Sequence, residues 1–446
     1  MNINALDEIV KATTDFLWGW PLVIFVIASG LIMTIALHGV QFRYFFRAWK
    51  YVLFPEKTSN QGEYISPLQA FVNTLSASVG NGSTAGMATA MFQGGPGAAF
   101  WIFVLGFLNM AIRYAEVYAS THFVDQTPQG LRGGPMRYIQ RVPGGSVLAY
   151  AYAFFCLMLA FITGNAMQCN SMRLGIEKMT CANPYVIAMF MFGFLLYIML
   201  GGAQRIIKVS DRIVPVKVGL FFIATFVVLV YHYASIIDAL RLIVTSAFTP
   251  QAVAGALTGW TVQNAIRFGI SRTLNATEAG LGSAAILYGS TASKHPVRSA
   301  IMSMASIFIS NHLVCFMLML VFVVSGVYNS GLTSTPLTIA AYTSVFGEFG
   351  GWVVTFLSIT FGMGVLVAYA YIGRECWMFL THGKMEWLYT AIYCGMAAFG
   401  ALSKVNLIWN LTDLINAGLI TINLYALLVL LPEIRKGLQA YMNAQA

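Results

Sequence analysis

The residues of this chain that could bind a solute are polar and charged side chains set inside long apolar blocks. One block contains SVGNGSTAGMATA at 78–90, a second contains EAGLGSA at 278–284, and single charges interrupt two others at Lys217 and Asp413. Glycines and hydroxyl residues in such blocks free backbone amides and carbonyls, which can hold a ligand by hydrogen bonds. No nucleophile stands in a pattern with a base, so the residues predict binding and not covalent catalysis.

The composition identifies the broad class of protein. Of the 446 residues, 58% are hydrophobic and only 9% are charged, whereas a soluble domain carries about 25% charged residues. Because a membrane-spanning helix needs roughly 20 mostly apolar residues, blocks such as 24–37, 186–200 and 214–233 indicate a bilayer. The net charge of +9 comes from basic residues in short loops, so nucleic-acid binding is not expected. The six cysteines show neither a disulfide framework nor zinc-ligand spacing.

We expect an all-α polytopic membrane protein with eleven spans. The apolar segments lie at 16–38, 66–92, 96–123, 146–174, 184–203, 213–232, 251–289, 296–326, 351–372, 387–403 and 405–431. Most of the 25 Lys and Arg residues fall in the connections on one side, which makes that side cytoplasmic by the positive-inside rule. We expect the N-terminal segment to be retained as the first span and not to be cleaved as a signal. The N-terminus then lies outside the cell and the C-terminus lies inside it.

Two of these segments are expected to be broken helices. Glycines and small polar residues weaken the segment at 66–92 at a depth where the membrane offers no water to freed backbone groups. In the segment at 251–289, the glycines of 278–284 follow a second interruption, RFGIS, at 267–271. Two glycine-interrupted spans at a five-span interval indicate the central site of a secondary transporter, although small residues also serve close helix packing. A channel would need a filter or a charged ring, and a receptor or scaffold would not need two broken helices.

Five ordered motifs resemble the alanine/glycine:cation symporter family. They are SVGNGSTAGMATAMFQGGPGAAFW at 78–101, GGPMRYI at 133–139, GNAMQCNS at 164–171, ATEAGLGSAA at 276–285 with HPVR at 295–298, and WNLTDLIN at 409–416. The resemblance implies a fold of the leucine-transporter type, with one extra helix at 16–38 before two inverted five-helix repeats at 66–232 and 251–431. It also implies sodium-driven uptake of alanine or glycine across the bacterial inner membrane, among membrane lipids and without a cofactor.

The first broken segment is the main candidate for the substrate site. An amino-acid zwitterion needs donors for its carboxylate and acceptors for its ammonium, which freed amides and carbonyls supply. The hydroxyl residues there could instead bond to their own helix, and an intramembrane Gln could serve only an interhelical bond. The residues expected at the substrate are Ser78, Gly80, Asn81, Gly82, Ser83 and Thr84, with Gln168 from a motif segment and Phe268 and Gly269 from the second broken segment.

Other polar residues in the spans predict a supporting network. Asn410, Asp413 and Asn416 recur every third residue and so form one stripe on the last span. Asn165 lies three residues before Gln168, a spacing that can place both on one helix face. A scaffold network and a direct transport role both fit such residues.

Three charged residues fall near the cytoplasmic ends of spans. They are Arg113, Glu116 and Arg137. Long charged side chains at helix ends extend to the membrane surface and form ion pairs there. This structural explanation is therefore the preferred one for all three.

The residues around the expected sodium site depart from the family pattern. In the resembled fold, one sodium ion is held by carbonyls of the first broken helix, here at Val79, and by hydroxyls of the eighth core helix. That helix has Gly364 where the family has a small hydroxyl residue, and Thr360 lies one turn earlier. Lys217 stands where the family usually has an apolar residue, and some relatives in the wider superfamily place a lysine of this helix at the vacated sodium site.

Two interpretations of Lys217 follow. Its ammonium could replace the bound sodium electrostatically, or it could extend to the cytoplasmic surface from about one turn inside the helix. Sodium coupling is the expectation from the family, and proton-coupled or sodium-independent transport is the alternative.

Overall fold

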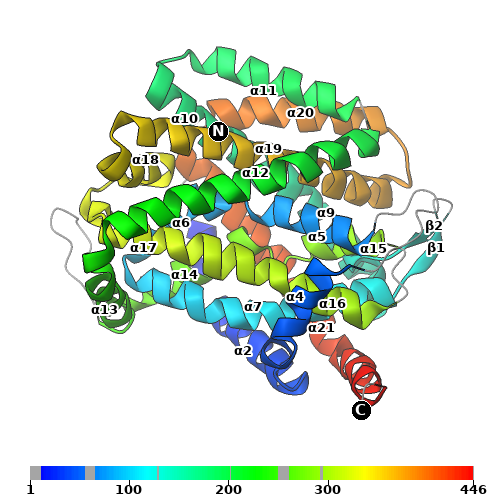
Figure 1. The fold of residues 1–446 in the computed structure, drawn as a ribbon. Coiled ribbons are helices and arrows are strands. Elements are labelled where there is room, and N and C mark those ends of the chain that lie inside the picture. The colour runs from blue at the N-terminus through cyan, green and yellow to red at the C-terminus, as the bar shows by residue number, and fades with distance from the viewer. Residues whose placement is uncertain are drawn as a thin grey trace.

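The structure is a computed structural model that describes residues 12–55, 66–127, 130–200, 202–249, 261–291 and 295–444. The described chain is a helical bundle with one short antiparallel hairpin, β1 (Asp125–Thr127) and β2 (Gly130–Arg132) (Figure 1). The helices are α2 (Trp20–Ala36), α3 (Val40–Arg43), α4 (Phe45–Leu53), α5 (Pro67–Ser78), α6 (Ala85–Gly94), α7 (Gly97–His122), α8 (Pro135–Ile139), α9 (Gly145–Phe161), α10 (Met167–Thr180), α11 (Pro184–Met199), α12 (Gly202–Tyr231), α13 (Ile236–Ser246), α14 (Val262–Thr277), α15 (Ser283–Gly289), α16 (Pro296–Ile307), α17 (Phe316–Val324), α18 (Ser334–Phe346), α19 (Glu348–Thr381), α20 (Glu386–Leu402) and α21 (Val405–Asn443).

Helices occupy all eleven predicted segments, and the predicted polytopic helical class is confirmed. The part of the seventh segment at 251–260 lies outside the described residues. Two spans each join two α-helices through a π-helical turn, η2 (Ile162–Ala166) between α9 and α10, and η4 (Phe308–Cys315) between α16 and α17. Within the described residues, six helical stretches are long and apolar enough by themselves to cross a membrane.

Five helices of the described loops were not predicted from hydropathy, because none is long enough to span a bilayer. They are α3, α4, α8, α13 and α18. In α4, exposed apolar and basic residues such as Phe46 and Lys50 alternate with buried Ala48. Such a pattern is typical of a helix that lies along a membrane surface.

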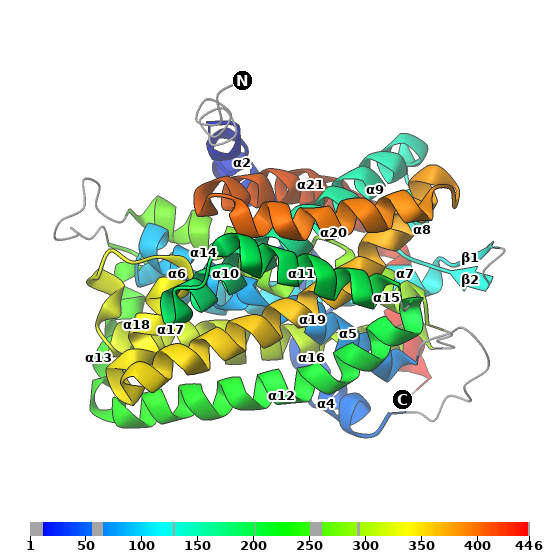
Figure 2. The ribbon, with the colours of Figure 1, turned by 90° about the horizontal axis from the view of Figure 1, so that it is seen from above.

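Long helices surround the broken ones. Two side-by-side pairs, α11 with α20 and α12 with α19, can be followed in Figures 1 and 2. The short helices α5, α6, α14 and α15 lie among these long helices. Helix α14 contacts α5 and α6, α15 contacts α5, and α6, α14 and α15 each contact α7. The extra N-terminal helix α2 packs on α7 and α21, where the indole nitrogen of Trp18 donates to the carbonyl of Asp413 at 2.8 Å.

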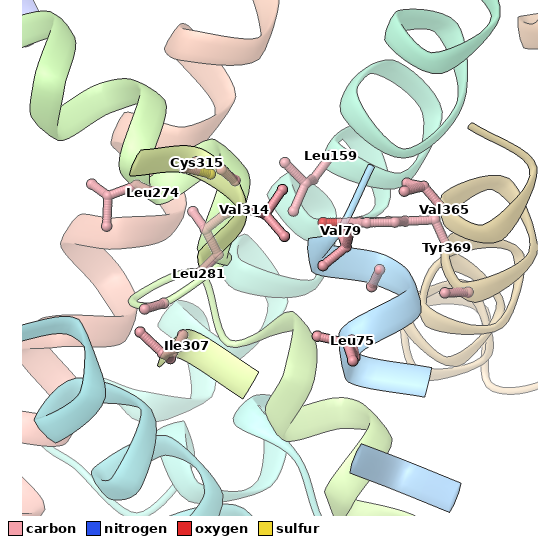
Figure 3. Close-up of a cluster of buried hydrophobic side chains, with 14 of the residues drawn as sticks. Leu75, Val79, Leu159, Leu274, Leu281, Ile307, Val314, Cys315, Val365 and Tyr369 are labelled. Carbon is pink, nitrogen blue, oxygen red and sulfur yellow. The ribbon is translucent and has the colours of Figure 1, made fainter. Parts of the chain in front are cut away.

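The space between the broken helices is filled by apolar side chains. Figure 3 shows Leu75 of α5 and Val79, which follows it, in one cluster with Leu281 of the second break and with Val365 and Tyr369 of α19. All five are buried. A solute held at the breaks therefore has polar backbone beside it and hydrocarbon around it.

Candidate functional site

The first break separates α5 from α6. A capping box fixes the start of α5, in which Ser66 and Gln69 each bond the backbone amide of the other. The helix ends at Ser78, and a single 3-10 turn, η1 (Asn81–Ser83), precedes α6. A side chain at Gly80 would place its Cβ only 2.2 Å from a methyl group of Val365. Glycine is therefore required there for the close approach of α19.

The second break separates α14 from α15. Glu278, Gly280 and Gly282 all have positive φ, at 57°, 85° and 77°, and this backbone path ends α14. The predicted interruption at 267–271 is wrong, because α14 runs through it without a break. Gly269 serves packing there, since its Cβ would lie 2.8 Å from the Cβ of Trp101 on α7.

The two breaks lie against each other at Gly82. A Cβ at this position would come within 3.1 Å of the carbonyl oxygen of Asn275 on α14 and 3.8 Å from the terminal methyl of Met167. Gly82 is buried on the η1 turn. The first break thus touches α14 less than one turn before the second break begins.

We expect Gly82→Leu to abolish uptake while the protein still inserts into the membrane, because the larger side chain would push the η1 turn away from Asn275. Uptake of labelled alanine into vesicles, normalised to folded protein, measures this effect. Gly193→Leu is the matched control, because no atom lies within 4 Å of a Cβ at this position of α11. Normal uptake by a folded Gly82→Leu protein would remove this segment from the binding site.

Asn81 is the most connected residue of the first break. Its backbone amide donates to Oε1 of Gln168 at 3.0 Å, and Gln168 in turn donates to the carbonyl of Thr163 at 3.0 Å. The Asn81 side chain donates to the carbonyl of Ser358 at 3.1 Å and accepts from its hydroxyl at 2.9 Å. Gln168 thus lies at the first break, and Ser358 of α19 bonds the Asn81 side chain there.

The hydroxyl residues of the first break bond to their own segment. Ser78 donates to the carbonyl of Thr74 at 2.9 Å, and Ser83 donates to the carbonyl of Ser78 at 3.0 Å. Thr84 contacts the carbonyl of Asn81 at 3.5 Å. These contacts correspond to the structural alternative given for the hydroxyls, and they hold the shape of the break.

Three other predicted residues make contacts away from the first break. Asn165 donates to the carbonyl of Tyr393 at 2.6 Å, because the π-helical turn η2 changes its direction relative to Gln168. Thr360 donates within its own helix to the carbonyl of Phe356 at 3.0 Å. The ring of Phe268 lies 5.1 Å from the guanidinium carbon of Arg267.

Lys217 lies inside the bundle and does not extend to the surface. Its ammonium donates to the carbonyls of Ser76 at 3.0 Å and Val79 at 2.6 Å, and its side chain is fully buried. Gly364 faces the ammonium, since a Cβ there would lie 2.6 Å from Nζ. The surface interpretation of Lys217 is therefore wrong, because the freed carbonyls at the end of α5 attract its charge.

Asp413 forms a bidentate ion pair with Arg272, at 2.6 and 2.8 Å. Asn275 donates to the same carboxylate at 3.4 Å and accepts from Asn416. Asp413 and Asn416 of the predicted stripe thus share one network, which ends at the α14 turn that touches Gly82. One signal could have found Arg272 from sequence, since an intramembrane arginine needs an acid partner.

Two neighbours complete the surroundings of this pair. The guanidinium of Arg272 lies 4.7 Å from the ring centre of Trp409, and Trp409 is 3.0 Å from the position of a Cβ on Gly86 of α6. The carbonyl of Asn410, the third member of the stripe, accepts from the hydroxyl of Thr14 at 3.3 Å.

The structure corrects the expectation for Arg113 and Glu116. Both side chains are fully buried and lie at the second break, because the carbonyl of Thr277 and the amide of Gly282 are their partners. Arg137 lies 3.7 Å from Asp125 of the hairpin, with about a quarter of its side chain exposed. Among the described residues, no group of three or more His, Cys, Asp and Glu is placed to hold a metal ion.

Two broken helices that meet inside a bundle of membrane spans define a secondary transporter of solutes. A family model described as the sodium:alanine symporter family matches residues 3–446. An uncharacterized transporter of Haemophilus influenzae is 33% identical over 427 residues, or 95% of this chain and 93% of that protein. The sodium/alanine symporter AgcS of Methanococcus maripaludis is 31% identical over 432 residues, or 95% of this chain and 94% of that protein. The chain belongs to the sodium:alanine symporter family.

Solved structures agree on the fold. MhsT in complex with L-phenylalanine has a TM-score of 0.61 at 12% identity, over 83% of this chain and 90% of that chain. A sodium-coupled sialic acid symporter has a TM-score of 0.58 at 11% identity, over 92% of this chain and 87% of that chain. The predicted fold of the leucine-transporter type is confirmed, and the protein is a multi-pass membrane transporter and not an enzyme.

Proposed function

We propose that this protein transports a small neutral amino acid, alanine or glycine, across the bacterial inner membrane, with the Lys217 ammonium in place of one sodium ion. The N-terminus lies outside and the C-terminus in the cytoplasm, and two inverted repeats at 66–232 and 251–431 follow the helix at 16–38. Membrane lipid and the coupling cation are the other partners. Membership of a symporter family and a relative named as a sodium/alanine symporter support the amino-acid substrate.

The position of the Lys217 ammonium carries the proposal on coupling. It donates to the carbonyls of Ser76 and Val79, which α5 leaves without helical partners where it ends. Those carbonyls are the acceptors that would otherwise hold a cation at a broken helix. Two like charges at one pair of carbonyls would repel each other strongly in a low-dielectric interior, so the ammonium and a sodium ion exclude each other.

The residues opposite the ammonium fit the same proposal. Gly364 leaves space for Nζ, and its carbonyl accepts from the hydroxyl of Ser76 at 3.0 Å. Thr360, the nearby hydroxyl residue of α19, is bonded within its own helix. The α19 face toward Lys217 therefore offers room for the lysine and not the hydroxyl ligands of a sodium ion.

The packing around the first break supports a small substrate. Val365 lies against Gly80, and Met167 and Asn275 lie against Gly82. An overpacked apolar group costs typically about 1–3 kcal/mol or more. These close neighbours favour a substrate with a small side chain over one with a branched side chain.

Uptake of labelled alanine into proteoliposomes tests the proposal. We expect saturable uptake that glycine inhibits and leucine does not, with little change when a sodium gradient is imposed. A proton gradient is applied in separate vesicles to show whether the proton is the coupling cation. Equal inhibition by leucine would contradict the small site, and strong sodium dependence would contradict the role of Lys217.

A further inference from the structure

A pair of charged residues on α7 bonds both ends of the second break. The guanidinium of Arg113 donates to the carbonyl of Thr277, the last residue of α14, at 2.5 Å. One turn later, Oε1 of Glu116 accepts from the backbone amide of Gly282 at 2.9 Å, directly before α15 begins. The two side chains are fully buried, with 3.7 Å between Nε and Oε2. One helix thus bonds the two sides of the interruption through one ion pair.

Other helices satisfy the backbone between these two points. Asn423 of α21 donates to the carbonyl of Gly280 at 3.0 Å and to Oε1 of Glu116 at 2.8 Å. Tyr152 of α9 donates to the carbonyl of Leu281 at 2.7 Å. Backbone groups at a helix interruption in a membrane must find partners within the protein, and here side chains of α7, α9 and α21 provide them.

The chemistry of each partner matches the end that it bonds. A guanidinium can only donate hydrogen bonds and an ionised carboxylate can only accept them. Arg113 therefore suits the carbonyl of Thr277, where the partial negative charge of the 16-residue helix α14 also favours a cation. Glu116 suits the amide of Gly282. Exchange of the two charges would preserve the ion pair and would present the wrong polarity at both ends.

Stability alone does not explain a buried ion pair. Apolar residues of similar volume are often as stabilising as such a pair, because both charges lose their hydration. What apolar residues cannot do is fix a carbonyl on one half-helix and an amide on the other at set positions. The pair is therefore suited to positioning the break.

We infer that Arg113 and Glu116 are positioning residues that keep α14 and α15 in fixed register across the second break, so that the substrate site at the adjoining first break keeps its shape. The link between the breaks is the contact of Gly82 with the Asn275 carbonyl of α14. The inference rests on the proposed function in one respect, because it assumes that the two breaks form the substrate site.

Two double variants separate positioning from simple charge pairing. In Arg113→Gln with Glu116→Gln, an amide still donates to Thr277 and another still accepts from Gly282, without charges. We expect the KM for alanine to stay within about threefold of the natural protein. In Arg113→Glu with Glu116→Arg, the ion pair survives with reversed polarity, and we expect the KM to rise by about tenfold or more. A pair that acted only through its charges would give the opposite order and would overturn the inference.

Hydrogen exchange supplies a readout that needs no transport. We expect the peptide at 274–289 to exchange faster in the reversed variant than in the neutral one, measured on purified monodisperse protein by mass spectrometry. Equal exchange in both variants would contradict the positioning role, even if the natural protein transported no alanine and the proposed function failed. If the reversed variant does not fold, Glu116→Ala replaces it, because it removes the acceptor of Gly282; unchanged exchange in Glu116→Ala would also overturn the inference.

A second ion pair serves as the matched control. Arg173 and Glu177 form an ion pair one turn apart on α10, in which both side chains are partly exposed. We expect Arg173→Gln with Glu177→Gln to leave both the KM and the exchange of 274–289 unchanged. A change of similar size in this control would show that any lost ion pair has the effect, and would refute a specific role for Arg113 and Glu116.

Discussion

Lys217→Met is expected to lower alanine uptake by about tenfold or more, although it restores the apolar residue usual in the family. The substitution leaves the carbonyls of Ser76 and Val79 without their donor, and each unsatisfied buried polar group costs about 1–3 kcal/mol. Uptake in vesicles is compared with that of Lys178→Met, which changes an exposed lysine on α10. If Lys217→Met is active and the natural protein depends on sodium, the proposal that the Lys217 ammonium replaces a sodium ion is contradicted.

A compensating substitution at Gly364 tests the same proposal by a gain of uptake. Gly364→Ser alone is expected to block uptake, because its Cβ would lie 2.6 Å from the ammonium of Lys217. In Lys217→Ala with Gly364→Ser, the ammonium is gone and a hydroxyl faces the two carbonyls, which together form oxygen ligands for a sodium ion. We expect this double variant to regain part of the uptake only when sodium is present. Recovery that is independent of sodium would contradict the assignment of this place as a cation site.

Removing either partner of the Arg272–Asp413 pair is expected to abolish transport and to destabilise the protein. Arg272→Met and Asp413→Leu each leave a buried charge without its partner, at a typical cost of about 3–5 kcal/mol. The double variant removes both charges, and we expect it to recover most of the thermal stability. Uptake is expected to stay low, because the Asn275 turn beside Gly82 loses the carboxylate that orients it.

Thermal unfolding in detergent and uptake in vesicles are measured on the same preparations. Arg374→Gln with Glu386→Gln is the matched control, since this ion pair is partly exposed and joins α19 to α20. Low uptake in a stable double variant supports a role in transport beyond scaffolding. Normal uptake in that variant would assign Arg272 and Asp413 to the scaffold alone.

The spans could be predicted from sequence because hydrophobicity in blocks of about 20 residues is a local property. The breaks were harder to place. The single glycine of RFGIS and the pair of glycines in EAGLG each suggest a helix interruption. Of these three glycines, only Gly280 and Gly282 adopt positive φ. Gly269 stays helical because its missing side chain makes room for Trp101. Only the packed structure distinguishes a glycine that interrupts a helix from a glycine that allows a neighbouring helix to pack closely.

The partners of buried charges could not be predicted from sequence. Arg272 and Asp413 are 141 residues apart, and Arg113 lies 164 residues from Thr277. Nearness to a predicted helix end suggested a surface position for Arg113, although its partner is a break in another helix. Lys217 differs, because its departure from the family pattern and the glycine at 364 made the inner position one of two interpretations, and the packed structure decides between them.

A cation that is part of the protein changes the energy available for accumulation. A sodium ion that enters with its substrate moves one positive charge, which a membrane voltage of 100 mV drives with about 2.3 kcal/mol, or roughly 50-fold accumulation. The ammonium of Lys217 is attached to α12 and cannot leave with the solute, and a zwitterion carries no net charge. As long as Lys217 keeps its proton, each cycle is electrically silent at this site. The voltage then does no work at this site, and accumulation of the amino acid depends on a coupling cation that crosses at another place in the protein.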